Sequence, residues 1–163
     1  MTLAELNGCT KERFVEAVGW VFEHSPWVAE RAWRKRPFPS FDDLSTRMIQ
    51  EVQAASPEEQ LALLCAHPDL GTRAKVSASS AAEQSGAGLD QLTRQEYEQL
   101  LRLNADYRKK FGFPFLFAVK DSDKAAIIDA LKRRLNSPPE QEFQVALGNV
   151  FRIARFRLEN TIQ

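Results

Sequence analysis

The chain has 163 residues and a formal net charge of +0, with 22 Lys and Arg against 22 Asp and Glu. This length suits one domain with its own hydrophobic core, and the balanced charge argues against a nucleic-acid-binding protein or one held at an anionic membrane surface. No apolar run approaches the length of a membrane span, and no basic segment precedes an apolar run as in a secretory signal. Two cysteines without a metal-binding spacing fit a reduced, cytoplasmic protein, and two histidines are too few for a histidine-built zinc site. We therefore expect a soluble single domain over residues 1–163 that binds small molecules, with no metal, no nucleic acid and no membrane.

Start and stop signals divide the first part of the chain into short helices. Thr2 and Glu5 form a capping box before a first turn that Gly8 ends, and Thr10 begins a helix that Pro26 ends. Three further helices are predicted over the basic segment that carries Trp27 and Trp33, after Ser40, and from Ser56-Pro57 to His67.

The segment 69–90 is rich in glycine and serine, shows little apolar periodicity and is predicted to be a loop. Thr93 begins a long helix that Gly112 ends, and the last two helices begin at Ser122 and Ser137. Between them, residues 113–119 are apolar throughout, but no second strand exists to pair with them, so we expect a buried extended connector. The predicted fold is all-α, a single-domain bundle of roughly eight helices with this one connector.

Arg157 is a candidate for contact with a ligand. At about 100° per residue it falls about 40° from Phe143, on the apolar stripe of the last helix. A guanidinium on an apolar face keeps its charge and needs an anion or several acceptors. Periodicity leaves two interpretations open: a structural ion pair, or an anchor for a substrate carboxylate or oxo group.

His67 ends a helix, precedes Pro68 and adjoins the glycine- and serine-rich loop. A histidine there either offsets the helix dipole or acts as a general acid or base. One helical turn within the loop would present Ser80, Glu83 and Gln84 together, although most such clusters are exposed polar turns. His24 has only the dipole interpretation and is expected to be structural.

The connector at 113–119 is a further candidate, because buried backbone N–H and C=O groups without a strand partner need other partners. A planar polar heterocycle is one such partner. Asn104, on the core stripe of the preceding helix, is interpreted as a satisfied buried amide. Composition and spacing thus predict one pocket formed by His67, the 80–84 turn, the connector and Arg157.

Four segments carry a resemblance to a known family. They are the HPDLG run at 67–71, the SxxEQxxAGL pattern at 80–89, the NxxY and KFGFPF pair at 104–115, and the RIAxxRL pattern at 152–158. Together and in this order they resemble the 2-oxo-4-hydroxy-4-carboxy-5-ureidoimidazoline (OHCU) decarboxylases of uric acid breakdown. One departure is the segment 72–79, which is shorter than its counterpart in other members of that family.

The resemblance implies a cofactor-free lyase that decarboxylates OHCU to (S)-allantoin on an all-helical fold, as a homodimer. It implies His67 as the catalytic histidine with Glu83 as its partner. It also implies substrate contacts from Pro68, Ser80, Gln84, Phe115, Leu116, Phe117, Ala118, Val119 and Arg157. The chain ends without a peroxisomal address, which favours a cytoplasmic enzyme.

Two alternatives compete with this hypothesis. The first is a helical protein-binding module whose contact face is the basic, tryptophan-bearing segment near 31–36; it predicts an exposed aromatic patch. The second is a lyase or hydrolase that keeps His67 but binds a different ring.

Overall fold

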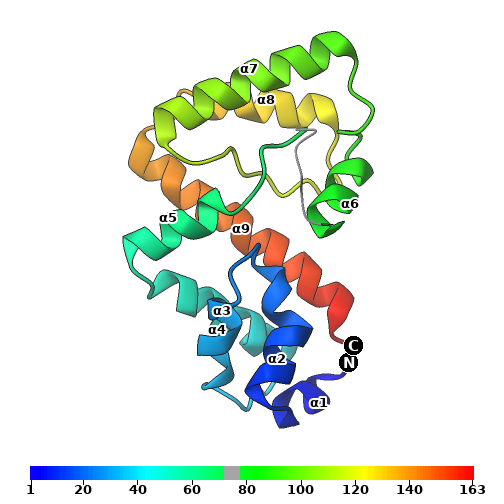
Figure 1. The fold of residues 1–163 in the computed structure, drawn as a ribbon, viewed down its shortest axis with the longest axis vertical. Coiled ribbons are helices and arrows are strands. Elements are labelled where there is room, and N and C mark those ends of the chain that lie inside the picture. The colour runs from blue at the N-terminus through cyan, green and yellow to red at the C-terminus, as the bar shows by residue number, and fades with distance from the viewer. Residues whose placement is uncertain (72–77) are drawn as a thin grey trace. The chain divides into compact units, whose positions relative to one another are not determined.

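The computed structural model describes residues 1–71 and 78–163. Within these residues the chain forms nine α-helices, one 3₁₀ helix and no strand, which confirms the all-α prediction. The chain divides into two compact units, Met1–Ala66 with Val150–Gln163 (unit 1) and His67–Asn149 (unit 2). Helix α9, Pro139–Thr161, contributes residues to both units (Figure 1). No helix in the described residues is long and apolar enough to span a membrane.

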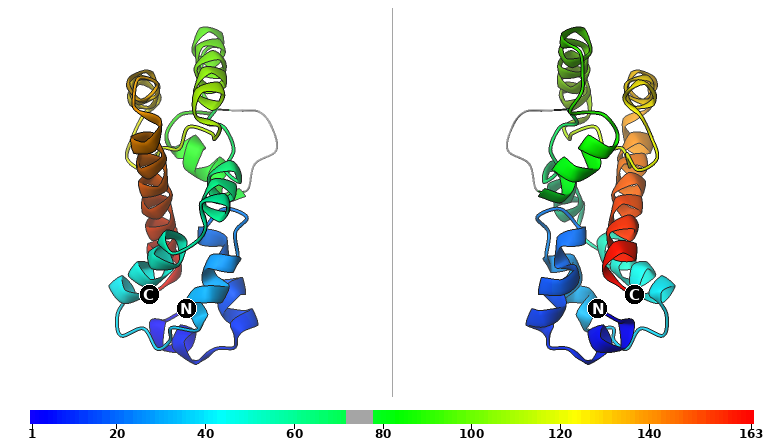
Figure 2. Two further views of the ribbon diagram at one scale, coloured as in Figure 1. Left: turned by 90° about the vertical axis from the view of Figure 1, so that its left-hand side faces the viewer. Right: turned by 90° about the vertical axis from the view of Figure 1, so that its right-hand side faces the viewer.

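Unit 1 is a cluster of short helices closed by the end of α9. They are α1 (Leu3–Gly8), α2 (Lys11–Val18), the 3₁₀ turn Gly19–Val21, α3 (Trp27–Trp33), α4 (Phe41–Gln53) and α5 (Pro57–Cys65). Helix α3 packs against both α2 and α4. The two chain ends lie close together (Figure 2), and the Gln163 amide donates to the Met1 carbonyl at 3.0 Å.

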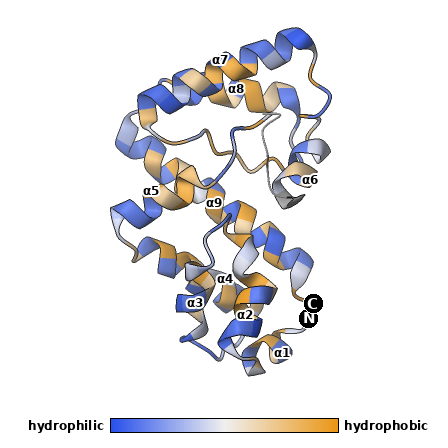
Figure 3. Ribbon diagram, in the orientation of Figure 1, coloured by the Kyte–Doolittle hydropathy of each residue, from blue (hydrophilic) through white to orange (hydrophobic). Residues whose placement is uncertain are grey.

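Unit 2 contains α6 (Ala78–Gly86), α7 (Arg94–Phe111), α8 (Lys124–Arg134) and the first part of α9, and α7 packs against α8. Gly112 ends α7 with a left-handed φ of 82°. The residues that follow, 114–119, belong to neither helix nor strand and are buried except for the half-buried Phe117. This connector is coloured mainly as hydrophobic in Figure 3.

Local capping signals predicted most helix starts correctly. The side chains of Thr2, Thr10, Ser40, Ser56 and Thr93 each accept a hydrogen bond from the backbone amide three residues later.

Several local predictions were wrong. The helix that begins after Thr10 ends at Val18, is followed by the 3₁₀ turn Gly19–Val21 and does not continue to Pro26. The last helix begins at Pro139 and not at Ser137. Residues 78–86 form helix α6 and not part of a loop, because small residues without an apolar stripe still tolerate helical geometry. Helix α8 is capped by Asp123 and not by Ser122, since the Asp123 carboxylate accepts from the Ala126 amide. The departure noted at 72–79 falls mainly on 72–77, which lie outside the described residues.

Candidate active site

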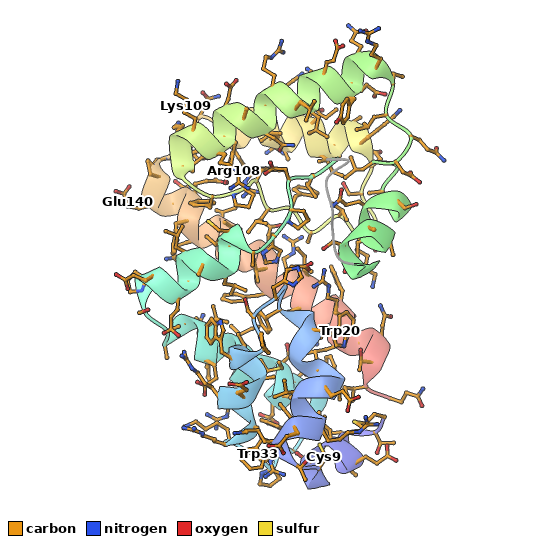
Figure 4. All side chains as sticks on the ribbon, viewed as in Figure 1. Cys9, Trp20, Trp33, Arg108, Lys109 and Glu140 are labelled. Atoms are coloured by element: carbon orange, nitrogen blue, oxygen red, sulfur yellow. The ribbon has the colours of Figure 1, made fainter. Side chains whose placement is uncertain are left out.

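His67 follows α5 and is buried, with 7% of its surface exposed. Helix α7 holds the segment that His67 begins. The Asn104 side-chain amide donates to the Leu70 carbonyl at 2.9 Å, and Arg108 pairs with Asp69 at 3.3 Å. Figure 4 shows Arg108 and its neighbour Lys109 on opposite sides of α7. The histidine therefore lies on a short segment anchored at two of its next three residues.

Asn104 is a buried side-chain amide, as expected, but only one of its two polar groups has a hydrogen-bond partner among the described residues. Its Nδ2 donates to Leu70, but its buried Oδ1 has no hydrogen-bond partner among the described residues.

Helix α6 brings the polar residues of the SxxEQ pattern together at helical spacing. Ser80 and Gln84 are buried, with 6% and 9% of their surfaces exposed, and Glu83 is half-buried. The Gln84 side-chain oxygen accepts the Gly71 amide at 2.9 Å, which ties α6 directly to the His67 segment. This bond fixes the orientation of the Gln84 amide, whose donor end is Nε2.

Two side chains from neighbouring helices hold the connector. The Ala118 amide donates to Asn149 Oδ1 at 3.0 Å, and Arg134 Nη1 donates to the Leu116 carbonyl at 2.7 Å. The Val119 carbonyl accepts from the Ser122 amide at 3.0 Å. In the described part of the chain the other backbone groups of 115–119 have no hydrogen-bond partner, so several buried donors and acceptors are available to a ligand.

A buried polar cluster lies behind the connector. Glu142 is fully buried, and its Oε1 accepts from the Tyr107 hydroxyl at 2.5 Å and from Arg134 Nε at 2.6 Å. Burial raises the pKa of Tyr107, and its hydrogen bond to Glu142 raises it further. The phenol therefore stays protonated and acts as a fixed donor.

Arg134, Glu142 and Asn149 were not predicted from the sequence. No local pattern distinguishes these three residues from surface polar residues. Their partners lie on other elements, so only the packing of distant segments makes them buried and paired.

Arg157 lies in unit 1 and is buried, as its periodicity predicted. It forms an ion pair with Glu23 at 2.9 Å, and its Nη1 also donates to the Val21 carbonyl at 3.3 Å. Its guanidinium lies 5.8 Å from the ring centroid of Trp20, which is labelled in Figure 4. The structural ion pair that periodicity left open is thus present.

In the basic segment proposed as a protein-binding face, arginine side chains lie over the two tryptophan rings. Trp27 and Trp33 are half-buried, and guanidinium groups lie over their rings at 4.4 Å (Arg31) and 4.2 Å (Arg36). The Trp33 indole also donates to the Cys9 carbonyl at 3.3 Å. These contacts occupy one face of each ring and the Trp33 indole N–H, and they weaken the binding-module alternative.

Comparison with known proteins gives a consistent result. A family described as OHCU decarboxylase matches residues 7–159. A 2-oxo-4-hydroxy-4-carboxy-5-ureidoimidazoline decarboxylase of Haloferax volcanii is 49% identical over 97% of this chain and 94% of its own length. The uric acid degradation bifunctional protein PucL of Bacillus subtilis is 47% identical over 99% of this chain, which corresponds to 33% of PucL.

Solved structures resemble the chain as well. A crystal structure of (S)-allantoin synthase superposes with a TM-score of 0.82 at 33% identity and covers 99% of this chain and 54% of that one. A crystal structure of OHCU decarboxylase in the presence of (S)-allantoin gives a TM-score of 0.72 over 93% of this chain and 97% of that one. Its identity is 21%, so this second likeness bears on the fold alone.

Proposed function

This chain belongs to the OHCU decarboxylase family, and from that membership we propose that it decarboxylates OHCU to (S)-allantoin, the last step of urate oxidation to allantoin in purine catabolism. It is a carboxy-lyase. The observation that carries this conclusion is the 49% identity to a decarboxylase over 97% of the chain and 94% of that relative. The family match over 7–159 supports treating residues 1–163 as one OHCU decarboxylase-like domain.

The chemistry of the substrate supports a reaction without a cofactor. Loss of CO₂ leaves an electron pair on the carbon that carried the carboxylate, and the adjacent ring imine delocalises it. The 4-hydroxyl becomes the carbonyl of allantoin, and a proton adds to the ring carbon that carries the ureido group. The substrate is thus its own electron sink, and the protein has to orient the ring and deliver one proton to one face.

His67 and Glu83 are proposed to act as a pair on the leaving carboxylate, the 4-hydroxyl and the transferred proton. Two features support this assignment: His67 is buried at the start of an anchored segment, and Glu83 adjoins the residue that ties α6 to Gly71. A side chain on such a fixed frame keeps its orientation while the substrate reacts.

The substrate ring is proposed to lie against Pro68, Ser80, Gln84 and the backbone of the connector. Gln84 is proposed to donate through Nε2, since the bond between its oxygen and the Gly71 amide orients the side chain. Within the connector, the Ala118 amide is occupied by Asn149, so the remaining amides of 115–119 are the candidate donors to the developing charge. Arg157 is proposed to hold the substrate, in competition with its ion pair to Glu23.

Two further proposals concern the state of the protein. We propose a homodimer, which follows from the family resemblance and which light scattering after size-exclusion chromatography would test. We also propose a cytoplasmic location, which cell fractionation would test.

The test of the function uses the chirality of the product. OHCU is generated in place from urate with the two preceding enzymes, the protein is added, and circular dichroism follows the allantoin formed. We expect rapid formation of one enantiomer, and its loss in folded His67→Ala and Glu83→Gln variants. A slow rise of racemic allantoin that is the same with and without the protein would contradict the proposal, because OHCU also decays without a catalyst.

A comparison of substrates separates the remaining alternative. An enzyme that keeps His67 but binds another ring would turn over a related ureide faster than OHCU in steady-state assays. A higher kcat/KM for OHCU than for these analogues is the result we expect.

A further inference from the structure

We infer that Arg134 and Asn149 are positioning residues for this reaction: they fix the two peptide planes on either side of Phe117 and so set the direction of its backbone N–H and C=O. The inference rests on the proposed function, because it concerns how the connector binds the substrate of that reaction. Neither residue is proposed to touch the reacting atoms.

Arg134 holds the first peptide plane. Its Nη1 donates to the Leu116 carbonyl at 2.7 Å, and its guanidinium carbon lies 4.5 Å from the centroid of the Phe115 ring. The other side of the guanidinium is held by Glu142, with Nε and Nη2 at 2.6 and 2.5 Å from Oε1. Only 12% of the Arg134 side chain is exposed, so this planar group has little freedom to turn.

Glu142 is in turn oriented by Tyr107. Two donors, Arg134 Nε and the Tyr107 hydroxyl, converge on Oε1. Arg134 Nη2 lies within ion-pair distance of Oε1 but forms no hydrogen bond among the described residues, and neither does the buried Oε2. The Tyr107 ring also contacts the rings of Phe113 and Phe115, at centroid separations of 5.9 and 5.4 Å. The same tyrosine therefore packs against the connector and fixes the carboxylate that fixes Arg134.

Asn149 holds the second plane. Its Oδ1 accepts the Ala118 amide at 3.0 Å, while its Nδ2 donates to the Val145 carbonyl one turn earlier in α9 at 3.0 Å. Because both ends of the amide are used, its oxygen cannot exchange places with its nitrogen without losing both bonds.

Because peptide groups are planar, these two hydrogen bonds also set the orientation of the Phe117 N–H and C=O. In a trans peptide the C=O of one residue and the N–H of the next point in opposite directions, and neither peptide of Phe117 is cis. Binding of the Leu116 carbonyl by Arg134 therefore directs the Phe117 N–H away from Arg134. Binding of the Ala118 amide by Asn149 likewise directs the Phe117 C=O away from Asn149.

Arg134 and Asn149 thus set the directions of one donor and one acceptor, the N–H and the C=O of Phe117. Neither group has a hydrogen-bond partner within residues 1–71 and 78–163, and Phe117 is the half-buried member of an otherwise buried connector. A donor and an acceptor on one residue match the N–H and C=O of a cyclic ureide. This is the chemical class of the proposed substrate.

Conservative and non-conservative variants of each residue test the inference. Arg134→Lys keeps a positive charge for Glu142 but replaces the three-nitrogen fork with one nitrogen, and Arg133→Lys, at an exposed position on the same helix, is its matched control. Asn149→Leu removes the acceptor for Ala118, whereas Asn149→Asp retains an oxygen there. The readouts are KM, kcat and the enantiomeric purity of the allantoin, together with the melting temperature of each variant.

We expect kcat/KM to fall about 10- to 100-fold in Arg134→Lys and Asn149→Leu, mainly through KM. We also expect Asn149→Asp to recover most of the loss and Arg133→Lys to match the wild type. If Arg134→Lys does not fold, the two Asn149 variants decide the question. Lower melting temperatures with unchanged KM and kcat would overturn the inference, as would an equal loss in Asn149→Asp and Asn149→Leu. Absence of turnover in the wild type would overturn the proposed function and this inference with it. A fully active wild type with fully active variants would overturn the inference alone.

Discussion

Gly71 has a backbone φ of 72°, in the left-handed region that residues with a Cβ rarely adopt. A Cβ built there would lie 2.3 Å from Leu100 Cδ2 and 3.2 Å from Leu92 Cδ1. Gly71→Ala therefore combines backbone strain with a clash against a buried leucine, and we expect it to lower the free energy of unfolding by about 1–3 kcal/mol. Denaturant titration of Gly71→Ala and Gly86→Ala checks this, because a Cβ at Gly86 meets nothing within 4 Å. Equal stability of the two variants would contradict the expectation.

The buried pair of Arg157 and Glu23 allows the two roles of Arg157 to be separated. Arg157→Met leaves the Glu23 carboxylate buried without its guanidinium, and we expect a loss of about 3–5 kcal/mol in the free energy of unfolding. The double variant with Glu23→Met removes both charges and should recover most of that stability. If Arg157 holds the substrate as proposed, KM stays raised in the double variant. A return of KM to the wild-type value would show that Arg157 serves only as the partner of Glu23.

Tyr107 makes stability sensitive to alkaline pH. Burial and its hydrogen bond to Glu142 raise the pKa of Tyr107 from its ordinary value of 10.0, so the folded protein retains a proton that the unfolded chain releases above that pH. The resulting stabilisation is fully present below pH 10.0 and is lost as the pH rises further, by at most about 1.4 kcal/mol per pH unit. We expect a shallower alkaline decline in the free energy of unfolding for Tyr107→Phe than for the wild type. Parallel curves for the two proteins would contradict this.

At the scale of elements, the start of α8 separates two adjacent capping candidates. The Asp123 carboxylate accepts from the Ala126 amide at 2.8 Å. Ser122 lies one residue before this cap, and its own amide donates to the Val119 carbonyl. We expect Asp123→Ala to cost about 1 kcal/mol in the free energy of unfolding and Ser122→Ala to cost much less. Thermal unfolding of the two variants side by side is the measurement. A larger loss in Ser122→Ala would contradict the cap assignment.

The helices show which features could be predicted from the sequence and which could not. Capping depends on atoms within three residues, so the boxes at Thr2, Ser56 and Thr93 were readable from the chain alone. The periodicity of the last helix likewise predicted that Arg157 is buried. Its partner Glu23 was not predictable, because that pairing depends on how segments far apart in the sequence pack.

In the candidate site, too, local features could be predicted from the sequence and long-range contacts could not. The motifs identified His67, Glu83 and the connector, and local geometry placed Ser80, Glu83 and Gln84 on one helix. The side chains that fix the connector lie far from it in sequence, as with Asn149 and Ala118. Their roles appear only once the three-dimensional structure is known.

At the scale of the whole molecule, each unit carries its own chromophore. All three tryptophans (20, 27 and 33) lie in unit 1, and both tyrosines (97 and 107) lie in unit 2. Because α9 runs without interruption through both units, we expect unfolding of one to remove a helix from the other. The transitions followed by tryptophan fluorescence and by tyrosine absorbance should therefore coincide in the wild type and shift together in Arg157→Met. Two separate midpoints, with the tyrosine transition unmoved, would contradict this coupling.

The division of the chain also has a consequence for its biosynthesis. Unit 2 is one continuous segment, 67–149, whereas unit 1 joins 1–66 to 150–163. A ribosome therefore completes every residue of unit 2 before it makes the end of α9 and the residues after it, which bring Arg157, Leu158 and Ile162 into the core of unit 1. Helices α1 to α5 are thus synthesised before the residues 150–163 that complete their core, and we expect their apolar faces to stay exposed to chaperones until those residues are made.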